Sequence, residues 1–117
     1  MLNFTTTEVN GILIIAFEPT AESGYDWQST QRDWLYQLIE SRDDPRFAID
    51  LGEVNYLASS EIGFLVTIKR RIDRRKGKVV VFGVCSYLQE VFQTMNLNRV
   101  LDVAETRSEA LSRLRTS

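Results

Sequence analysis

The chain has 117 residues, of which 44% are hydrophobic and 26% are charged, with a formal net charge of −2 at pH 7. This composition predicts one soluble globular domain over residues 1–117. There is no histidine and one cysteine, Cys85, which excludes histidine-based catalysis, histidine metal ligands and an intrachain disulfide. No apolar run approaches the roughly 20 residues that span a bilayer, and the start lacks the pattern of a secretory signal. We therefore expect a cytoplasmic protein that contacts no membrane and uses no metal or other cofactor.

The hydrophobic pattern predicts a hairpin at the start of the chain and alternating helices and strands after it. Residues 4–9 and 12–17 read as strands, and Asn10-Gly11 between them is a strong hairpin signal. The remaining predicted elements alternate between helices, with apolar residues at helical spacing, and short apolar strands. They are helix 28–41, strand 46–51, helix 59–76, strand 78–84, helix 86–95, strand 101–103 and helix 106–115. The order β-β-α-β-α-β-α-β-α predicts an α/β domain with a mostly parallel sheet of four to five strands, covered by helices.

Charge is unevenly distributed along the chain. Residues 69–78 contain seven of the 14 basic residues and one Asp, a net charge of +6, which leaves −8 on the remainder. Such a run can bind an acidic protein or nucleic acid, or it can be a solvated helix end whose cations complement the helix dipole. We favour the helix end. The interleaved aromatic residues typical of single-strand binders are absent from the run, and we expect no direct contact with nucleic acid.

The loop after the predicted strand 46–51 leads to two serines, Ser59 and Ser60, at the start of a helix. A helix N-terminus gathers unpaired N–H groups and partial positive charge, so an anion added there is favoured. A hydroxyl in this place is a good phosphate acceptor. The sequence therefore predicts a switch rather than a catalyst.

Residues advance about 100° each around a helix, so one arc of the second helix should face the sheet. That arc contains Ile62, Leu65, Val66 and Ile72. We expect Phe64, one turn below Ser60, to be exposed on the opposite arc as an aromatic anchor for a partner; the alternative is that a neighbouring helix or loop covers it. The predicted partner-binding residues of this arc and of the first helical turn are Ser59, Ser60, Glu61, Gly63, Phe64, Thr67 and Arg71.

Several of these residues form a pattern that resembles the STAS domain of bacterial anti-sigma factor antagonists. The pattern consists of Asp50-Leu51, Val54, Tyr56-Leu57, Ser59-Ser60 and Ile62-Gly63, followed by the strand 78–83, Val91-Phe92, Leu97 and Ala110-Leu111. The resemblance covers most of the chain and implies a STAS-like fold. It also implies partner switching, in which the unphosphorylated domain binds an anti-sigma factor that is also a serine kinase. The kinase then phosphorylates a serine at the helix start, and a phosphatase resets the domain; carried onto this sequence, Ser60 is the phosphoacceptor.

Two residues depart from the family pattern. Ala58 stands where the family commonly has Asp, which removes a carboxylate that could cap the helix. Glu61 stands where the family commonly has Gly, and its charge would repel a phosphate of roughly −2 on Ser60. The alternative prediction is a STAS module that is not phosphorylated and docks constitutively in a stress-signalling or transporter ATPase complex.

Two further classes of function, a small-ligand-binding domain and an enzyme, have weaker support in the sequence. Open α/β sheets bind small ligands at the C-terminal ends of their strands, but Gly52 and Gly83 are isolated and form no phosphate-binding loop. An enzyme could use Asp50 or Glu53 as a base, yet Asp50 is more simply a strand-end carboxylate that accepts hydrogen bonds from nearby backbone N–H groups. We expect that the protein is not an enzyme.

Overall fold

The computed structural model describes residues 2–19 and 25–115. The chain starts with the hairpin of β1 (Leu2–Val9) and β2 (Ile12–Pro19), which pair antiparallel with Val9 opposite Ile12. Asn10 and Gly11 have φ angles of 51° and 85°. A two-residue turn with both φ angles positive matches the twist of the flanking strands, which is why Asn-Gly is favoured here. The predicted hairpin is confirmed.

The sheet continues in parallel from β2 through three more strands. They are β3 (Arg46–Asp50), β4 (Lys78–Phe82) and β5 (Asp102–Ala104), and the five-stranded sheet has the order β1-β2-β3-β4-β5. Phe47 and Ile49 are fully buried on one face of β3, and Ala48 is fully buried on the other. A strand buried on both faces reads as a continuous apolar run, as β3 and β4 do.

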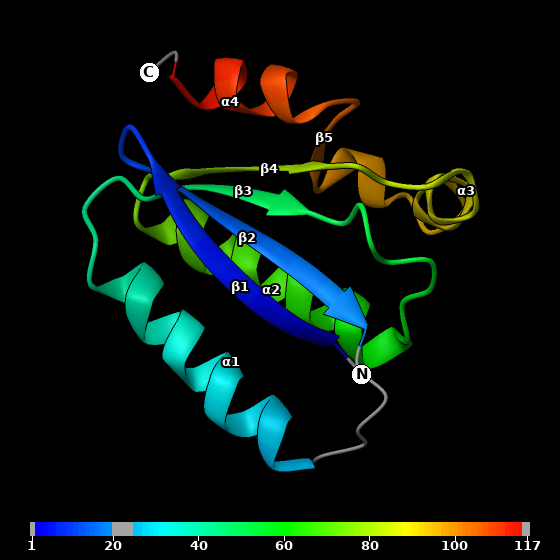
Figure 1. The fold of residues 1–117 in the computed structure, drawn as a ribbon, viewed down its shortest axis with the longest axis horizontal. Helices are drawn as coiled ribbons and strands as arrows, with labels where there is room; N and C mark the ends of the chain where they lie inside the picture. The colour runs from blue at the N-terminus through cyan, green and yellow to red at the C-terminus, as the bar shows by residue number, and fades with distance from the viewer. Residues whose placement is uncertain (1, 20–24, 116–117) are drawn as a thin grey trace.

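Helices cover both faces of the sheet (Figure 1). They are α1 (Tyr25–Glu40), α2 (Ser59–Arg74), α3 (Ser86–Thr94) and α4 (Arg107–Arg115), with a short 3₁₀ helix, η1 (Leu97–Arg99), after α3. In Figure 1, α1 and α2 lie on one side of the sheet and α4 on the other. The larger core fills the space between α1, α2, α3 and the sheet, and α4 buries Ala110 and Leu114 on the opposite face.

The predicted α/β fold and element order are confirmed, with η1 as an addition between α3 and β5. Predicted ends differ by a few residues, as is usual at frayed helix and strand ends. No helix within residues 2–19 and 25–115 is long and apolar enough to cross a membrane.

The junction between α2 and β4 is tightly packed. Lys76 has a φ of 60°, and the next N–H groups turn back into the fold, with Lys78 N–H donating to the Pro45 carbonyl oxygen at 2.8 Å. A Cβ atom on Gly77 would lie 2.1 Å from that oxygen. Only glycine lets the α1–β3 and α2–β4 connections approach this closely, which fixes the C-terminal end of α2.

Candidate functional site

The candidate site starts at the C-terminal edge of the sheet, where β3 leads into α2. Leu51 N–H donates to the Phe82 carbonyl oxygen at 3.0 Å, so the chain stays tied to β4 after β3 ends. The connection is then held by three buried side chains, Leu51, Val54 and Leu57. Asp50 Oδ1 accepts a hydrogen bond from Gly52 N–H at 2.8 Å. This confirms the simple interpretation of Asp50 as a strand-end carboxylate that stabilises the turn.

Ser59 and Ser60 occupy the first turn of α2, and both are exposed. Ala58 precedes them with extended backbone angles, φ −73° and ψ 162°, and has no side-chain oxygen to cap the helix. The first N–H groups of a helix have no partner within the helix, and they carry its positive end. The prediction that Ser60 stands exposed at a helix start is confirmed.

Glu61 behaves differently from the expectation that it presents a charge beside Ser60. Its side chain is buried, with 7% exposed, and Oε1 accepts a hydrogen bond from the Ala58 N–H at 2.7 Å. A carboxylate at the third helical position folds back on the residue before the helix, as in one half of a capping box. Glu61 therefore caps the helix start through the Ala58 N–H, a different donor from the first-turn N–H groups that a side-chain oxygen at residue 58 would bind, and it is not a surface residue of the site.

The prediction that Phe64 is exposed is wrong. Its side chain is only 8% exposed, and its ring lies edge-on to Phe17 of β2 at 6.1 Å between centroids and close to Tyr36 of α1 at 5.8 Å. The helical arc that we assigned to the sheet is too narrow, because α2 packs against α1 as well as against the sheet. Phe64 lies on the flank that faces α1, and it belongs to the core.

Besides the two serines, Gly63 and Thr67 of the predicted surface lie along the first half of α2. Gly63 is exposed, with open space where a Cβ would stand, and the half-buried Thr67 donates its hydroxyl hydrogen to the Gly63 carbonyl oxygen at 2.9 Å. Together with the two serines these residues form a strip along the first half of α2. We call Ser59, Ser60, Gly63 and Thr67 the serine face.

Arg71 lies beyond the serine face and is engaged with α1. Its guanidinium carbon lies 3.9 Å from the centroid of the Tyr36 ring, and it forms an ion pair with Glu40 at 3.6 Å. Burial raises the pKa of Tyr36, and the nearby Arg32 and Arg71 lower it to a smaller extent, so the ring stays neutral beneath Arg71. Arg71 therefore connects the two helices, in addition to the partner-binding role predicted for it.

Other cations of residues 69–78 are also paired within the fold. Lys69 bridges to Asp73 one turn further on at 2.7 Å, and Arg75 bridges to Asp43 at 3.0 Å and donates to the Arg42 carbonyl oxygen. These contacts agree with a helix end whose cations complement the dipole. Binding of an acidic partner to this segment stays a prediction.

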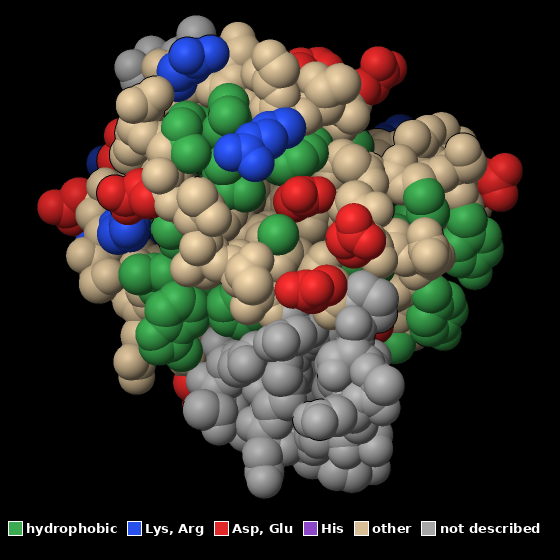
Figure 2. All heavy atoms as spheres, in the orientation of Figure 1, with side chains coloured by type: hydrophobic (Ala, Val, Ile, Leu, Met, Phe, Trp, Pro, Cys, Tyr) green, Lys and Arg blue, Asp and Glu red, His purple; other side chains and the backbone are tan. Residues whose placement is uncertain are grey.

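Sequence reasoning passed over an exposed aromatic residue beside the serines. Tyr56, on the loop just before α2, is 65% exposed, and Tyr87, at the start of α3, is 54% exposed. Figure 2 shows hydrophobic side chains gathered on the side of the molecule that carries α3 and the β3–α2 loop. The exposure of Tyr56 could have been predicted from the sequence. The neighbouring apolar residues Val54 and Leu57 anchor the loop, so Tyr56 is not needed for that purpose.

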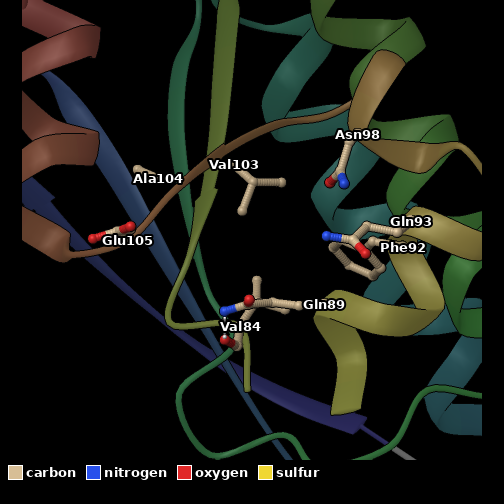
Figure 3. A pocket seen from close by; sticks show the side chains of 8 residues that line it. All are labelled: Val84, Gln89, Phe92, Gln93, Asn98, Val103, Ala104 and Glu105. Atoms are coloured by element: carbon tan, nitrogen blue, oxygen red, sulfur yellow. Dashed lines mark hydrogen bonds between the residues drawn. The ribbon is translucent and has the colours of Figure 1, made fainter. Parts of the chain in front are cut away.

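A cavity of about 460 Å³ lies nearby, at the C-terminal ends of β4 and β5. Its lining residues are Val84, Gln89, Phe92, Gln93, Asn98, Val103, Ala104 and Glu105. In Figure 3 the Gln93 and Asn98 amides lie on one side, Val103 points from β5 toward them, and the Glu105 carboxylate points away. Gln89 donates to the Val84 carbonyl oxygen at 3.0 Å. None of these lining residues is Lys or Arg, which does not favour a phosphate-bearing ligand.

The fold and the site define an α/β domain with exposed serines at the start of a helix. A family model described as STAS domain matches residues 4–110, and the chain belongs to that family. No curated protein sequence matches it significantly.

Solved structures with the same fold include anti-sigma factor antagonists. One is an anti-sigma-factor antagonist (STAS) domain protein from Planctomyces limnophilus, with a TM-score of 0.81 and 22% identity over 97% of this chain and 98% of that one. Another is RsbS from Moorella thermoacetica, in a variant with glutamate for a serine, with a TM-score of 0.81 and 17% identity over 96% and 94%. The phosphorylated form of SpoIIAA, a Bacillus cell fate determinant, has a TM-score of 0.69 and 18% identity over 97% and 100%. At these identities the likeness shows the fold alone.

Proposed function

We propose that this chain is an anti-sigma factor antagonist that works by partner switching, and that phosphorylation of Ser60 controls it. Its partners are an anti-sigma factor that is also a serine kinase, and a phosphatase that removes the phosphate. The observation that carries the proposal is the exposed Ser60 in the first turn of α2, at the edge of a STAS fold. In this role the chain is a regulatory binding protein and not an enzyme.

The proposed docking surface is the serine face together with Tyr56. Tyr56 supplies the exposed aromatic ring that we had assigned to Phe64, since interface hot spots are rich in Tyr. Gly63 leaves room for a partner's backbone to approach the helix. Glu61 and Phe64 contribute indirectly, because they hold the first turns of α2 in place from inside the fold.

Phosphorylation acts through charge at this surface. A phosphate adds about −2 at pH 7 and three strongly accepting oxygens. At the centre of an interface it has to lose water without a partner that neutralises it, which is costly. The existence of a phosphorylated form of SpoIIAA, a structural neighbour, supports a modification of this kind.

The test compares the effect of adding a charge at residue 60 with the effect of removing only the hydroxyl group there. The partner is first isolated by affinity capture on the wild-type chain. Ser60→Asp should weaken its binding by about 2 kcal/mol or more, since this variant places an unpaired charge in the contact. Ser60→Ala removes only a hydroxyl, with an effect of about 1 kcal/mol. Titration calorimetry measures both, and Ser108→Asp and Ser108→Ala are the matched controls, because Ser108 is an exposed serine in the first turn of α4 on the other face of the sheet. Phosphopeptide mass spectrometry of the native protein checks the acceptor directly; equal affinities of the two Ser60 variants would remove Ser60 from the mechanism.

One observation favours the alternative of a constitutive docking module. The Glu61 carboxylate already occupies the N–H of Ala58 at the positive end of α2, so a phosphate on Ser60 would gain less from that end of the helix. Under this alternative the partner binds the unmodified chain, and Ser60→Asp and Ser60→Ala bind it with about equal affinity. Detection of a phosphate on Ser60 in cells would contradict it.

A further inference from the structure

The two edges of the sheet are protected to different degrees. β5 has three residues, and Arg113 of α4 closes over it, bonded to the Asp102 carboxylate and the Val103 carbonyl oxygen. β1 has eight residues, contains no Pro, Lys or Arg, and exposes the run from Thr5 to Thr7. Natural edge strands are usually short, or interrupted by Pro, Lys or a bulge, because a long regular edge is a template for another strand. β1 is long, its pairing with β2 is regular, and Glu8 is its one charged residue.

The hairpin register determines which groups of β1 point outward. Val9 and Ile12 flank the two-residue turn, and the pair that flanks such a turn exchanges hydrogen bonds within the hairpin. Because bonded and non-bonded pairs alternate, Thr5 and Thr7 bond to β2. Phe4, Thr6 and Glu8 therefore direct their N–H and carbonyl groups away from β2, toward the open edge.

We propose that β1 pairs antiparallel with β1 of a second copy of this chain, about a two-fold axis at Thr6. Thr6 then lies opposite Thr6 of the second copy, and Phe4 lies opposite Glu8 of the second copy. This register matches each of the three outward-directed residues Phe4, Thr6 and Glu8 with another of the three. Thr–Thr pairs across strands are favourable, whereas a parallel arrangement would place Glu8 beside Glu8.

Side chains on the α1 side of the edge indicate why the occupant is a second copy. Trp34 of α1 is 48% exposed and stacks on Phe4 at 5.8 Å between centroids, and Glu8 forms an ion pair with Arg42 at 2.9 Å. In the proposed register the Glu8–Arg42 pair of one copy comes beside the Phe4–Trp34 stack of the other. A guanidinium near the face of a tryptophan is attracted to it. Each copy thus supplies both halves of the contact, the aromatic pair and the ion pair.

The first test removes one outward N–H group. In sedimentation equilibrium the wild-type chain should follow a monomer–dimer equilibrium, and Thr6→Pro should weaken the dimer at least about tenfold. Thr6→Val is the matched control, because it keeps the N–H group and should dimerise like the wild type. Tyr87→Ala, at an exposed residue on α3, should also leave the dimer unchanged. A wild-type chain that stays monomeric, or a dimer that Thr6→Pro does not weaken, overturns the proposal.

The second test does not depend on how well the proline variant folds. In a Cys85→Ser background, Thr6→Cys should form a disulfide-linked dimer under mild oxidation, because opposite Cα atoms of a bonded pair lie about 5.5 Å apart. Thr5→Cys should not, because its own copy lies diagonally at about 7–8 Å. Equal cross-linking of both variants indicates a parallel or irregular contact, and no cross-linking of Thr6→Cys indicates another interface or occupant; either result overturns the proposal.

Discussion

Replacing Phe64 tests the packing of α2 against α1. The ring is 8% exposed and contacts Phe17 and Tyr36, and truncation of a buried Phe to Ala typically costs about 3–5 kcal/mol. Because the ring lies at the margin of the core, we expect Phe64→Ala to lower the free energy of unfolding by about 3–4 kcal/mol. With an m-value of about 2 kcal/mol/M, the urea midpoint falls by about 1.5–2 M.

The matched control is Tyr87→Ala, an aromatic residue on α3 that is 54% exposed. Its truncation should change the free energy of unfolding by no more than about 1 kcal/mol. Phe64→Leu keeps most of the buried volume and should lie between the two. Urea unfolding monitored by circular dichroism measures all three variants. If Phe64→Ala loses no more stability than Tyr87→Ala, the assignment of Phe64 to the core is refuted.

Four further predictions concern a helix cap, two glycines and the dependence of stability on pH. Glu61→Ala should lower the free energy of unfolding by about 1–2 kcal/mol, because it removes the hydrogen bond to the Ala58 N–H. Glu61→Gln should have a stability between those of the wild type and Glu61→Ala. Equal stability of the wild type and both variants would contradict the capping role. Gly63→Ala should raise the melting temperature, because open space surrounds its Cβ and alanine gains about 1 kcal/mol in a helix. Gly77→Ala should lower it, because a Cβ there meets a carbonyl oxygen at 2.1 Å. Hydrogen bonds from the Glu105 N–H and from Arg113 lower the pKa of Glu109. The ionised Glu109 therefore stabilises the fold above the ordinary carboxyl pKa, and this stabilisation is lost as the pH falls through the lowered value. In Glu109→Gln the melting temperature should fall less steeply with decreasing pH on the acid side.

The elements that the sequence predicted well are those set by local chemistry. Asn10-Gly11 defines the hairpin because few other pairs adopt two positive φ angles. The alternation of apolar strands with amphipathic helices predicts the parallel sheet, since parallel strands need crossover connections. The exposed position of Ser60 follows in the same way, from a buried strand, a polar loop and a helix in succession.

The wrong prediction for Phe64 has a tertiary cause. The helical spacing of α2 shows that one arc is apolar, but it does not show how wide the buried arc is. That width depends on α1, whose Tyr36 contacts the ring from a segment nearly thirty residues earlier in the chain. Glu61 illustrates the same limit, because its spacing allows either a surface charge or a bond back to the Ala58 N–H.

The corrected positions of Phe64 and Glu61 bear on how a switch at Ser60 would operate. Phe64 holds the second turn of α2 between β2 and α1, Glu61 caps the first turn from inside, and Leu57 anchors the loop before it. A helix start that is held from within by packing and by a cap has little freedom to move when its outer face is modified. A phosphate on Ser60 would then change the charge of the docking surface without changing its shape. For this reason a single carboxylate at that position, in Ser60→Asp, is expected to reproduce much of the effect of the phosphate, and the stability of the free chain should change little.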